Sequence, residues 1–386
     1  MVIFDVVPPE YRWPVQFCTL ATITTYVLSL ITSNVSQVDR LWTFLPTIYA
    51  AYYALLPLLP NEQPFLFLPY TPRDLEWAAA RDFSPRALLI FSLIVAWMCR
   101  LTYNTNRRGL FNIQEEDYRW AVLRKQLPPW LFQITNLTFI SVTQNVLLLL
   151  LGLPTRVASV LQPHTALTLS DYTLSFLAIV VLVIEFTADN QQYAFQTYKH
   201  AFLAAEKGKA SMEAYDAQMQ WPGARLDWKP EDARRGFLTK GFWSYSRHPN
   251  SACEQAFWCI ITLMPLLSPS PPNITYSEID LSLLPTLSMI FEDFPHALIP
   301  FFQHLLGPLT HVVPALALLA LIFSSLIFTE SISMTKYPGY KAYRERVGML
   351  GIISTLEKGL LLKWNGRREE VDAIVWGKVK KLRKAE

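Results

Sequence analysis

The chain has 386 residues, of which 52% are hydrophobic and only 17% are charged. An average soluble domain carries about 25% charged residues, so this composition excludes a disordered chain, a collagen and a coiled coil and disfavours a soluble two-domain enzyme. The 13 glycines are about half of the usual number, and no G-x-G-x-x-G or Walker A segment occurs. A nucleotide, if one binds, is therefore not held by a Rossmann turn or a P-loop.

Seven uncharged stretches predict an all-α, polytopic membrane protein with about seven transmembrane helices, because a crossing takes about 20 mainly apolar residues. Two of the stretches are short and reach that length only if the charged residues beside them snorkel or face protein. A further apolar segment at 281–306 is broken by Glu292, Asp293 and Pro295, and we interpret it as a lumenal re-entrant or interfacial piece, with an additional crossing as the alternative. The seven stretches are 15–33, 41–60, 87–99, 129–154, 172–184, 255–272 and 309–329.

The positions of the basic residues predict the orientation. Of the 34 Lys and Arg residues, 29 fall in the loops and the tail on one side of the predicted crossings, whereas residues 272–309 contain none. The positive-inside rule then places the N-terminus in the lumen and the C-terminus in the cytosol. The glycosylation sequon at Asn273 lies on the predicted lumenal side. The last residues resemble a degenerate dilysine signal, so we expect the endoplasmic reticulum membrane.

We expect residues 1–350 to form the membrane domain and residues 351–386 to form a basic cytosolic tail. Between residues 357 and 386 the tail alternates basic residues with Leu, Val, Ile and Trp, which predicts an amphipathic helix at the membrane surface. The alternative is a tail surrounded by solvent.

Ionisable residues at membrane depth usually mark function. Glu185 and Asp189 are four residues apart and share a helix face, and so do Asn250 and Glu254. The cations of Arg247-His248 stand just before the second pair. Such groups suit a cavity for a polar molecule that carries phosphate, because Arg binds phosphate and Asn and Glu can bind a carboxamide or ribose hydroxyls. The alternative is that these side chains pair with one another and hold two helices together.

Tyrosines and histidines give two further patterns near the C-terminal crossing. Tyr337, Tyr340 and Tyr343 recur at steps of three beside cations, which suits either stacking on a base or anchoring at the membrane interface. The spacing of His296, His304 and His311 matches no zinc pattern, so we expect no metal. We also expect no nucleic-acid partner.

Five segments resemble a known membrane family. Residues 241–250, G-F-W-S-Y-S-R-H-P-N, followed by Glu254, resemble the signature of the uncharacterised branch of the steroid 5-alpha-reductase superfamily. The V-D-R-L-W at 38–42, E-D-Y-R-W at 116–120, A-D-N-Q at 188–191 and Y-P-G-Y at 337–340 agree with it in type and order. The resemblance covers roughly residues 35–350. Ser251 replaces the usual Tyr, and the polar loop 197–228 is longer than usual.

The resemblance implies a seven-helix reductase with NADPH in a cavity that faces the cytosol. Its lipid substrate, a sterol or long-chain enone, would enter from the bilayer. The family's carbonyl-polarising residues find no clear match, and Tyr103 and Tyr118 are our candidates for that catalytic role. The residues implied to hold NADPH are Glu185, Asp189, Arg235, Tyr245, Arg247, His248, Asn250, Glu254, Tyr337 and Tyr340, with Arg234 as the alternative to Arg235 near the phosphates.

Two other classes of protein stay open at this point. Isoprenylcysteine and phospholipid methyltransferases, which bind S-adenosylmethionine, share the R-H-P segment and the closing Tyr pattern. The V-D-R-L-W, E-D-Y-R-W and A-D-N-Q segments are not typical of them. The third class is a membrane protein that keeps the fold without catalysis.

Overall fold

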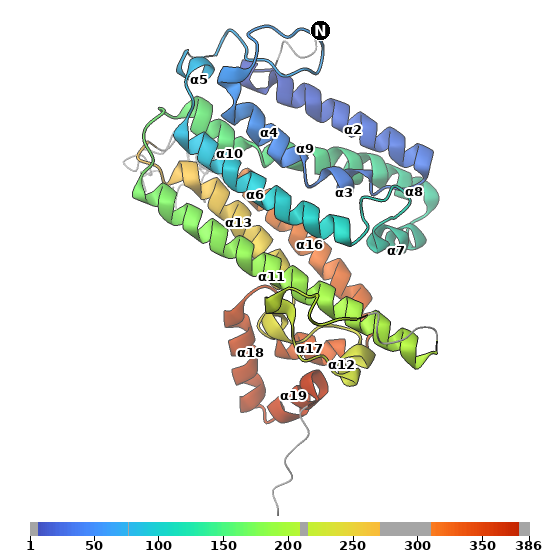
Figure 1. The fold of residues 1–386 in the computed structure, drawn as a ribbon. Coiled ribbons are helices and arrows are strands. Elements are labelled where there is room, and N and C mark those ends of the chain that lie inside the picture. Colours follow the sequence, from blue (N-terminus) through green and yellow to red (C-terminus); the bar gives the residue numbers. More distant parts are fainter. Residues whose placement is uncertain (1–6, 76, 209–214, 271–309, 378–386) are drawn as a thin grey trace, which may run out of the picture. The chain divides into compact units, whose positions relative to one another are not determined.

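The computed structural model describes residues 7–75, 77–208, 215–270 and 310–377. These residues form helices and no β-strand (Figure 1). Backbone contacts divide the chain into two compact units, the first made of Met1–Ile179 with Trp258–Leu319 and the second of Val180–Phe257 with Ala320–Glu386. The long helices α11 (Leu169–Glu206), α13 (Pro249–Leu266) and α16 (Val313–Lys336) each contribute to both units.

Five helical segments in the described part of the chain are long and apolar enough to cross a membrane, as a polytopic membrane protein requires. Each overlaps one of the seven stretches predicted from the sequence. They are Pro9–Thr32, which contains α2 (Arg12–Thr32); Pro85–Arg107, which is α6; Pro129–Leu161; α11; and α16.

A buried ion pair allows the two shortest apolar stretches to become full-length helices. Arg86 near the start of α6 and Asp171 near the start of α11 are 2% and 0% exposed. Their Nε–Oδ1 and Nη2–Oδ2 distances are 2.8 and 2.9 Å. The guanidinium and the carboxylate satisfy each other inside the first unit, as buried charges must. The prediction that the flanking charges face protein is confirmed for these two residues.

The other two stretches do not form comparable helices, so a count of seven crossings is not confirmed. The stretch at 41–60 contains α4 (Leu45–Ala54) and the single turn η2 (Leu56–Leu58). Ten helical residues span about 15 Å, half of a hydrocarbon core. The stretch at 255–272 begins inside α13, whose first turns carry Asn250 and Glu254. Residues 271–309, which include the sequon and the predicted re-entrant piece, lie outside the described residues.

In the first unit, helix α4 is enclosed by its neighbours. Tyr52, Tyr53 and Leu56 pack with Trp13 of α2 in one buried cluster. Other contacts of this unit are polar: Asn145 of α9 (Gln144–Leu150) donates to Thr25 Oγ1 of α2 at 3.1 Å, and both residues are buried. Preceding α9, residues Asn136–Thr143 form a π-helix within the third segment. Buried amide and hydroxyl groups thus hold α2 against the third segment.

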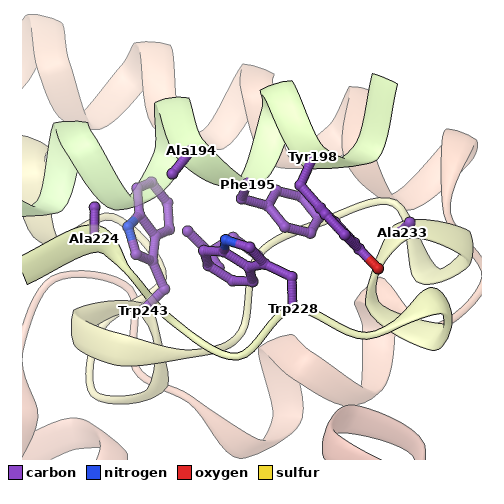
Figure 2. Packing of buried hydrophobic residues seen from close by; sticks show 8 residues of the cluster. Ala194, Phe195, Tyr198, Ala224, Trp228, Ala233 and Trp243 are labelled. Carbon is purple, nitrogen blue, oxygen red and sulfur yellow. The ribbon is translucent and has the colours of Figure 1, made fainter. Parts of the chain in front are cut away.

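In the second unit, α11 covers an apolar cluster formed by the following loop. The loop includes η6 (Pro222–Ala224), α12 (Pro230–Arg235) and η7 (Gly241–Ser244). Figure 2 shows Trp228 and Trp243 of the loop beneath α11, beside Phe195 and Tyr198. The polar loop predicted at 197–228 is shorter in the structure, because residues 197–206 continue α11, and Trp228 at its end packs in this cluster of aromatic side chains.

The C-terminal residues fold as two short helices instead of the single amphipathic helix that we predicted. These are α18 (Ile352–Trp364) and α19 (Arg368–Trp376), separated by a bend with Gly366 at φ 67°. Val371 and Val375 of α19 and Leu362 of α18 pack against α17 (Tyr340–Arg346). α18 keeps a large exposed apolar surface that comprises Ile352, Ile353, Leu356, Leu360, Leu361 and Trp364.

Candidate functional site

The R-H-P-N segment is fixed to the chain beyond α17 by its backbone. The Arg247 amide donates to the Gly348 carbonyl at 2.9 Å, and the His248 amide donates to the Met349 carbonyl at 3.1 Å. Pro249 then begins α13, a position where a proline costs no hydrogen bond. Arg247 and His248 thus form a short bend, and Pro249 and Asn250 of the same motif are the first residues of the helix that also carries Glu254.

A single carboxylate, Glu330 of α16, contacts the charged side chains of the R-H-P-N segment and that of Arg344. Its Oε1 accepts from Arg247 Nε at 2.6 Å and lies 3.1 Å from His248 Nε2. Its Oε2 accepts from Arg247 Nη2 at 3.1 Å and lies 3.0 Å from Arg344 Nε. Glu330 is 1% exposed and Arg247 4% exposed. A buried carboxylate with this many donors is fully compensated.

Arg247 therefore acts within the protein, since all three guanidinium nitrogens are engaged. Besides the two bonds to Glu330, its Nη1 donates to the carbonyls of Arg344 and Val347. We expected Arg247 near the phosphates of a cofactor, whereas in the structure its guanidinium binds Glu330 and two backbone carbonyls and so holds its own segment in place. Sequence reasoning missed Glu330. The available signal was a carboxylate one residue beyond the apolar run 309–329, at a depth where a charge needs a partner.

The two polar helix faces identified from their spacing meet through a side-chain bond, which is the kind of pairing that the alternative interpretation expected. Asn250 Nδ2 of α13 donates to Asp189 Oδ1 of α11 at 3.1 Å. Asp189 and Glu185 are buried on α11, while Asn250 and Glu254 are half-buried on α13. Asp189 and Asn250 thus face one another within the second unit, and Glu185 and Glu254 lie four residues from them on the same helices. This group offers acceptors from both helices and donors from the amide.

Gln191 explains why the A-D-N-Q and G-F-W segments occur together. Its Oε1 accepts from the Phe242 amide at 2.9 Å and its Nε2 donates to the Gly223 carbonyl at 3.0 Å. Gly241 has φ 62°, and a Cβ at that position would overlap the Gln191 side chain. Glycine is therefore required on two grounds. The clamp fixes the loop directly before the R-H-P-N segment.

The aromatic residues predicted to hold a base are mostly buried. Tyr340 packs edge-on against Phe237 with ring centroids 5.1 Å apart. Tyr337 lies 5.8 Å from the same ring and covers Gly236. Tyr245 is exposed and its carbonyl accepts from Thr355 at 2.6 Å. Tyr337 and Tyr340 thus belong to a packed cluster, and only Tyr245 presents an open ring.

Arg235 is held by an acidic partner on its own helix. Asp232 bonds to Arg235 Nη2 and to Lys240 Nζ. Burial raises the pKa of this carboxyl, but the hydrogen bonds from Lys240 and the Lys229 amide and the charge of Arg235 outweigh it, so the pKa of Asp232 lies below its usual value. Arg234 instead pairs with Glu206 at 2.8 Å on the surface. Of these two alternatives, Arg235 is the half-buried one.

The predicted catalytic tyrosines belong to the first unit and are exposed there. Tyr103 lies on α6, and Tyr118 begins α7 (Tyr118–Gln126). The segment around Tyr118 is tied to the V-D-R-L-W segment, since Trp120 Nε1 donates to Asp39 Oδ2 at 2.9 Å and the Asp117 amide donates to Ser36 Oγ at 3.0 Å. The V-D-R-L-W and E-D-Y-R-W segments are therefore bonded to each other, which gives a physical reason why both occur in the chain.

Among the residues that the structure describes, no group of three His, Cys, Asp or Glu side chains is placed to hold a metal ion. His296 and His304 lie outside those residues.

The five apolar segments and the absence of strands in the described ranges define a helical, polytopic membrane protein. The chain belongs to the family described as "Protein of unknown function (DUF1295)", whose model matches residues 25–270. It is 27% identical over 323 residues to a protein of Schizosaccharomyces pombe described as "Uncharacterized protein C594.04c", over 83% of this chain and 73% of the yeast protein. No solved structure matches.

Proposed function

We propose that the protein is a membrane-embedded reductase that uses NADPH to reduce a carbon–carbon double bond conjugated to a carbonyl in a lipid. The observation that carries the proposal is the group formed by the buried carboxylates Glu185 and Asp189 of α11 and the half-buried Asn250 of α13, which donates to Asp189. Buried ionisable residues in a membrane protein are expensive and mark functional sites. We further propose that the family is a branch of the steroid 5-alpha-reductase superfamily, on the strength of the five segments described above.

The residues present fit the polar half of a nicotinamide nucleotide. Asn250 offers a donor and an acceptor at the start of α13, which suits a carboxamide. Asp189, Glu185 and Glu254 offer carboxylate oxygens, which accept from ribose hydroxyls. The cofactor supplies the hydride when bound, and the protein binds and orients it. Arg247 and His248 contribute indirectly, because Glu330 fixes the segment that leads into α13.

The lipid substrate would reach the protein from the bilayer, which suits the five apolar segments. A group that polarises the substrate carbonyl is also needed, and Tyr103 and Tyr118 remain our candidates. Both are exposed and both stand beside the basic segment between the second and third apolar segments.

We place the protein in the endoplasmic reticulum membrane with its C-terminus in the cytosol. The distribution of Lys and Arg supports this orientation. The exposed apolar surface of α18, with Lys358 and Lys363 on the same helix, supports a position of that helix at the cytosolic membrane surface.

Thermal unfolding of the purified full chain in detergent, with a panel of ligands, tests the proposed function. NADPH at 100 times its dissociation constant should stabilise the folded protein by about 2.7 kcal/mol. S-adenosylmethionine should have no effect. Stabilisation by S-adenosylmethionine alone would identify a methyltransferase, and no effect of either ligand would favour a protein whose polar group only holds α11 against α13.

A further inference from the structure

Lys199 is a buried ammonium group without a carboxylate partner. It lies on α11 in the second unit, is 8% exposed, and donates from Nζ to the Gly236 carbonyl at 3.2 Å. Within the described residues no Asp or Glu forms an ion pair with it. Lysine is almost never fully buried unless it is paired, because removing an ion from water is costly. The Gly236 carbonyl and the face of the Phe195 ring, whose centre lies 5.7 Å from Nζ, offset this charge without a counter-charge.

A second uncompensated cation lies close by. Lys336, the last residue of α16, directly precedes Tyr337, whose ring lies against Gly236, the residue whose carbonyl accepts from Lys199. The Lys336 side chain is exposed, and its Nζ lies 5.3 Å from the centre of the Tyr337 ring. No carboxylate of the described chain pairs with Lys336 either. Like charges repel each other, whereas an anion bound between the two ammonium groups would be attracted by both.

Arg235, which directly precedes Gly236, offers a further donor. Its Nη2 pairs with Asp232, but its Nε is buried and has no acceptor in the described residues. Asp232 is already shared between Arg235 and Lys240. Asp232 is therefore engaged by its own neighbours, and no ion pair of the described residues joins a carboxylate to Lys199 or Lys336.

The backbone at Gly236, between these side chains, lies close to the Tyr337 ring. Gly236 has φ 88°, a conformation that favours glycine. A Cβ at this position would overlap the Tyr337 ring. The ring can therefore cover the backbone whose carbonyl holds Lys199. Any other residue would displace Tyr337 or the carbonyl, and with them the position of the ammonium group.

We propose that Lys199, Lys336 and the Arg235 Nε–H group form a binding site for a phosphate group. A phosphate carries up to two negative charges and several acceptor oxygens, which match two ammonium groups and one guanidinium donor. The phosphate can belong to a soluble nucleotide or to a phospholipid headgroup, since Lys336 ends an apolar segment. In the nucleotide case the site rests on the proposed function and would hold a phosphate of its cofactor.

The test uses two probes that contain no nicotinamide, so its outcome is separate from that of the proposed function. The full chain in detergent is titrated with 2′,5′-ADP, with adenosine as the uncharged control. It is also titrated with phosphatidic acid, with phosphatidylcholine as the control. The variants are Lys199→Met, Lys336→Gln and, as the matched control, Lys341→Gln. Lys341 is exposed on α17 and its replacement removes the same single charge.

Lys336→Gln and Lys199→Met should each weaken one probe by about tenfold, as expected for one lost hydrogen bond to a charged group. Lys341→Gln should leave both affinities at the wild-type value. Loss of 2′,5′-ADP binding identifies a nucleotide phosphate, and loss of phosphatidic acid binding identifies a lipid headgroup. If Lys199→Met does not fold, the exposed Lys336→Gln decides the matter. Failure of both probes to bind the wild-type chain, or equal affinities of Lys336→Gln and Lys341→Gln, overturns the proposal.

Discussion

Replacing Glu330 with Gln should destabilise the second unit strongly, because one carboxylate serves Arg247, Arg344 and His248. Gln keeps the size of the side chain and one acceptor oxygen. It loses the charge and presents an NH₂ group to a guanidinium that can only donate. The Arg247 guanidinium, 4% exposed, would then keep its charge without a counter-charge.

The structure sets the expected magnitude. Breaking a buried ion pair by removing one partner costs about 3–5 kcal/mol. Arg344 is 40% exposed in its side chain, so water can replace its contact with Glu330, whereas Arg247 has no such access. We therefore expect a loss of about 3 kcal/mol in the free energy of unfolding, at the lower end of that range.

Denaturant titration of the purified variants in detergent measures this loss. The matched control is Arg367→Gln, which breaks the Arg367–Glu345 ion pair of 2.6 Å in the same unit. Those side chains are 53% and 34% exposed, and such a pair contributes about 0–1 kcal/mol. Equal stabilities of Glu330→Gln and Arg367→Gln would refute the argument that Glu330 holds the R-H-P-N segment.

Three further predictions follow from local geometry. Gly236→Ala should lower the free energy of unfolding by about 2–4 kcal/mol in a denaturant titration, because of the positive φ and the overlap with Tyr337. The control Gly109→Ala, at φ 75° with no atom near an added Cβ, should lower it by only about 1–2 kcal/mol. Equal losses would contradict the overlap at Gly236. The pKa of Asp232 is lowered in the folded protein, so its carboxylate stabilises the fold above the unfolded pKa of about 3.9, and this stabilisation is lost as the pH falls through the lower folded pKa. Asp232→Asn should therefore reduce the fall of the unfolding free energy at acid pH. An unchanged fall at acid pH would contradict this role of Asp232. Leu360→Glu, on the exposed face of α18, should make the C-terminal region more accessible to protease in reconstituted vesicles, and unchanged cleavage would remove α18 from the membrane surface.

The lack of charge and the length of the apolar stretches identified the five segments that can cross a membrane, but not their ends. Arg86 and Asp171 bound two apolar stretches in the sequence, yet both helices include them, because each charge neutralises the other. For α4 the reverse holds, since its apolar residues are buried against other helices. Hydropathy alone cannot distinguish a residue that faces lipid from one that faces protein.

Spacing placed Glu185 and Asp189 on one helix face and Asn250 and Glu254 on another, and the bond between Asp189 and Asn250 confirms that the two faces meet. The ion pair of Arg247 could not be predicted from the sequence, because its partner Glu330 is distant in sequence and belongs to no recognised motif. Local patterns predict which side chains share a helix face, whereas the choice of partner depends on tertiary packing.

Binding of NADPH to Asn250→Ala, measured by calorimetric titration alongside the unfolding temperature, tests the central claim most directly. Asn145→Ala is the matched control, because it removes a buried amide with the same 3.1 Å bond between helices, in the first unit. We predict that Asn250→Ala weakens NADPH binding by about 1–3 kcal/mol while Asn145→Ala lowers only stability. NADPH affinity that stays at the wild-type value in Asn250→Ala while its unfolding temperature falls would show that Asn250 and Asp189 only join two helices.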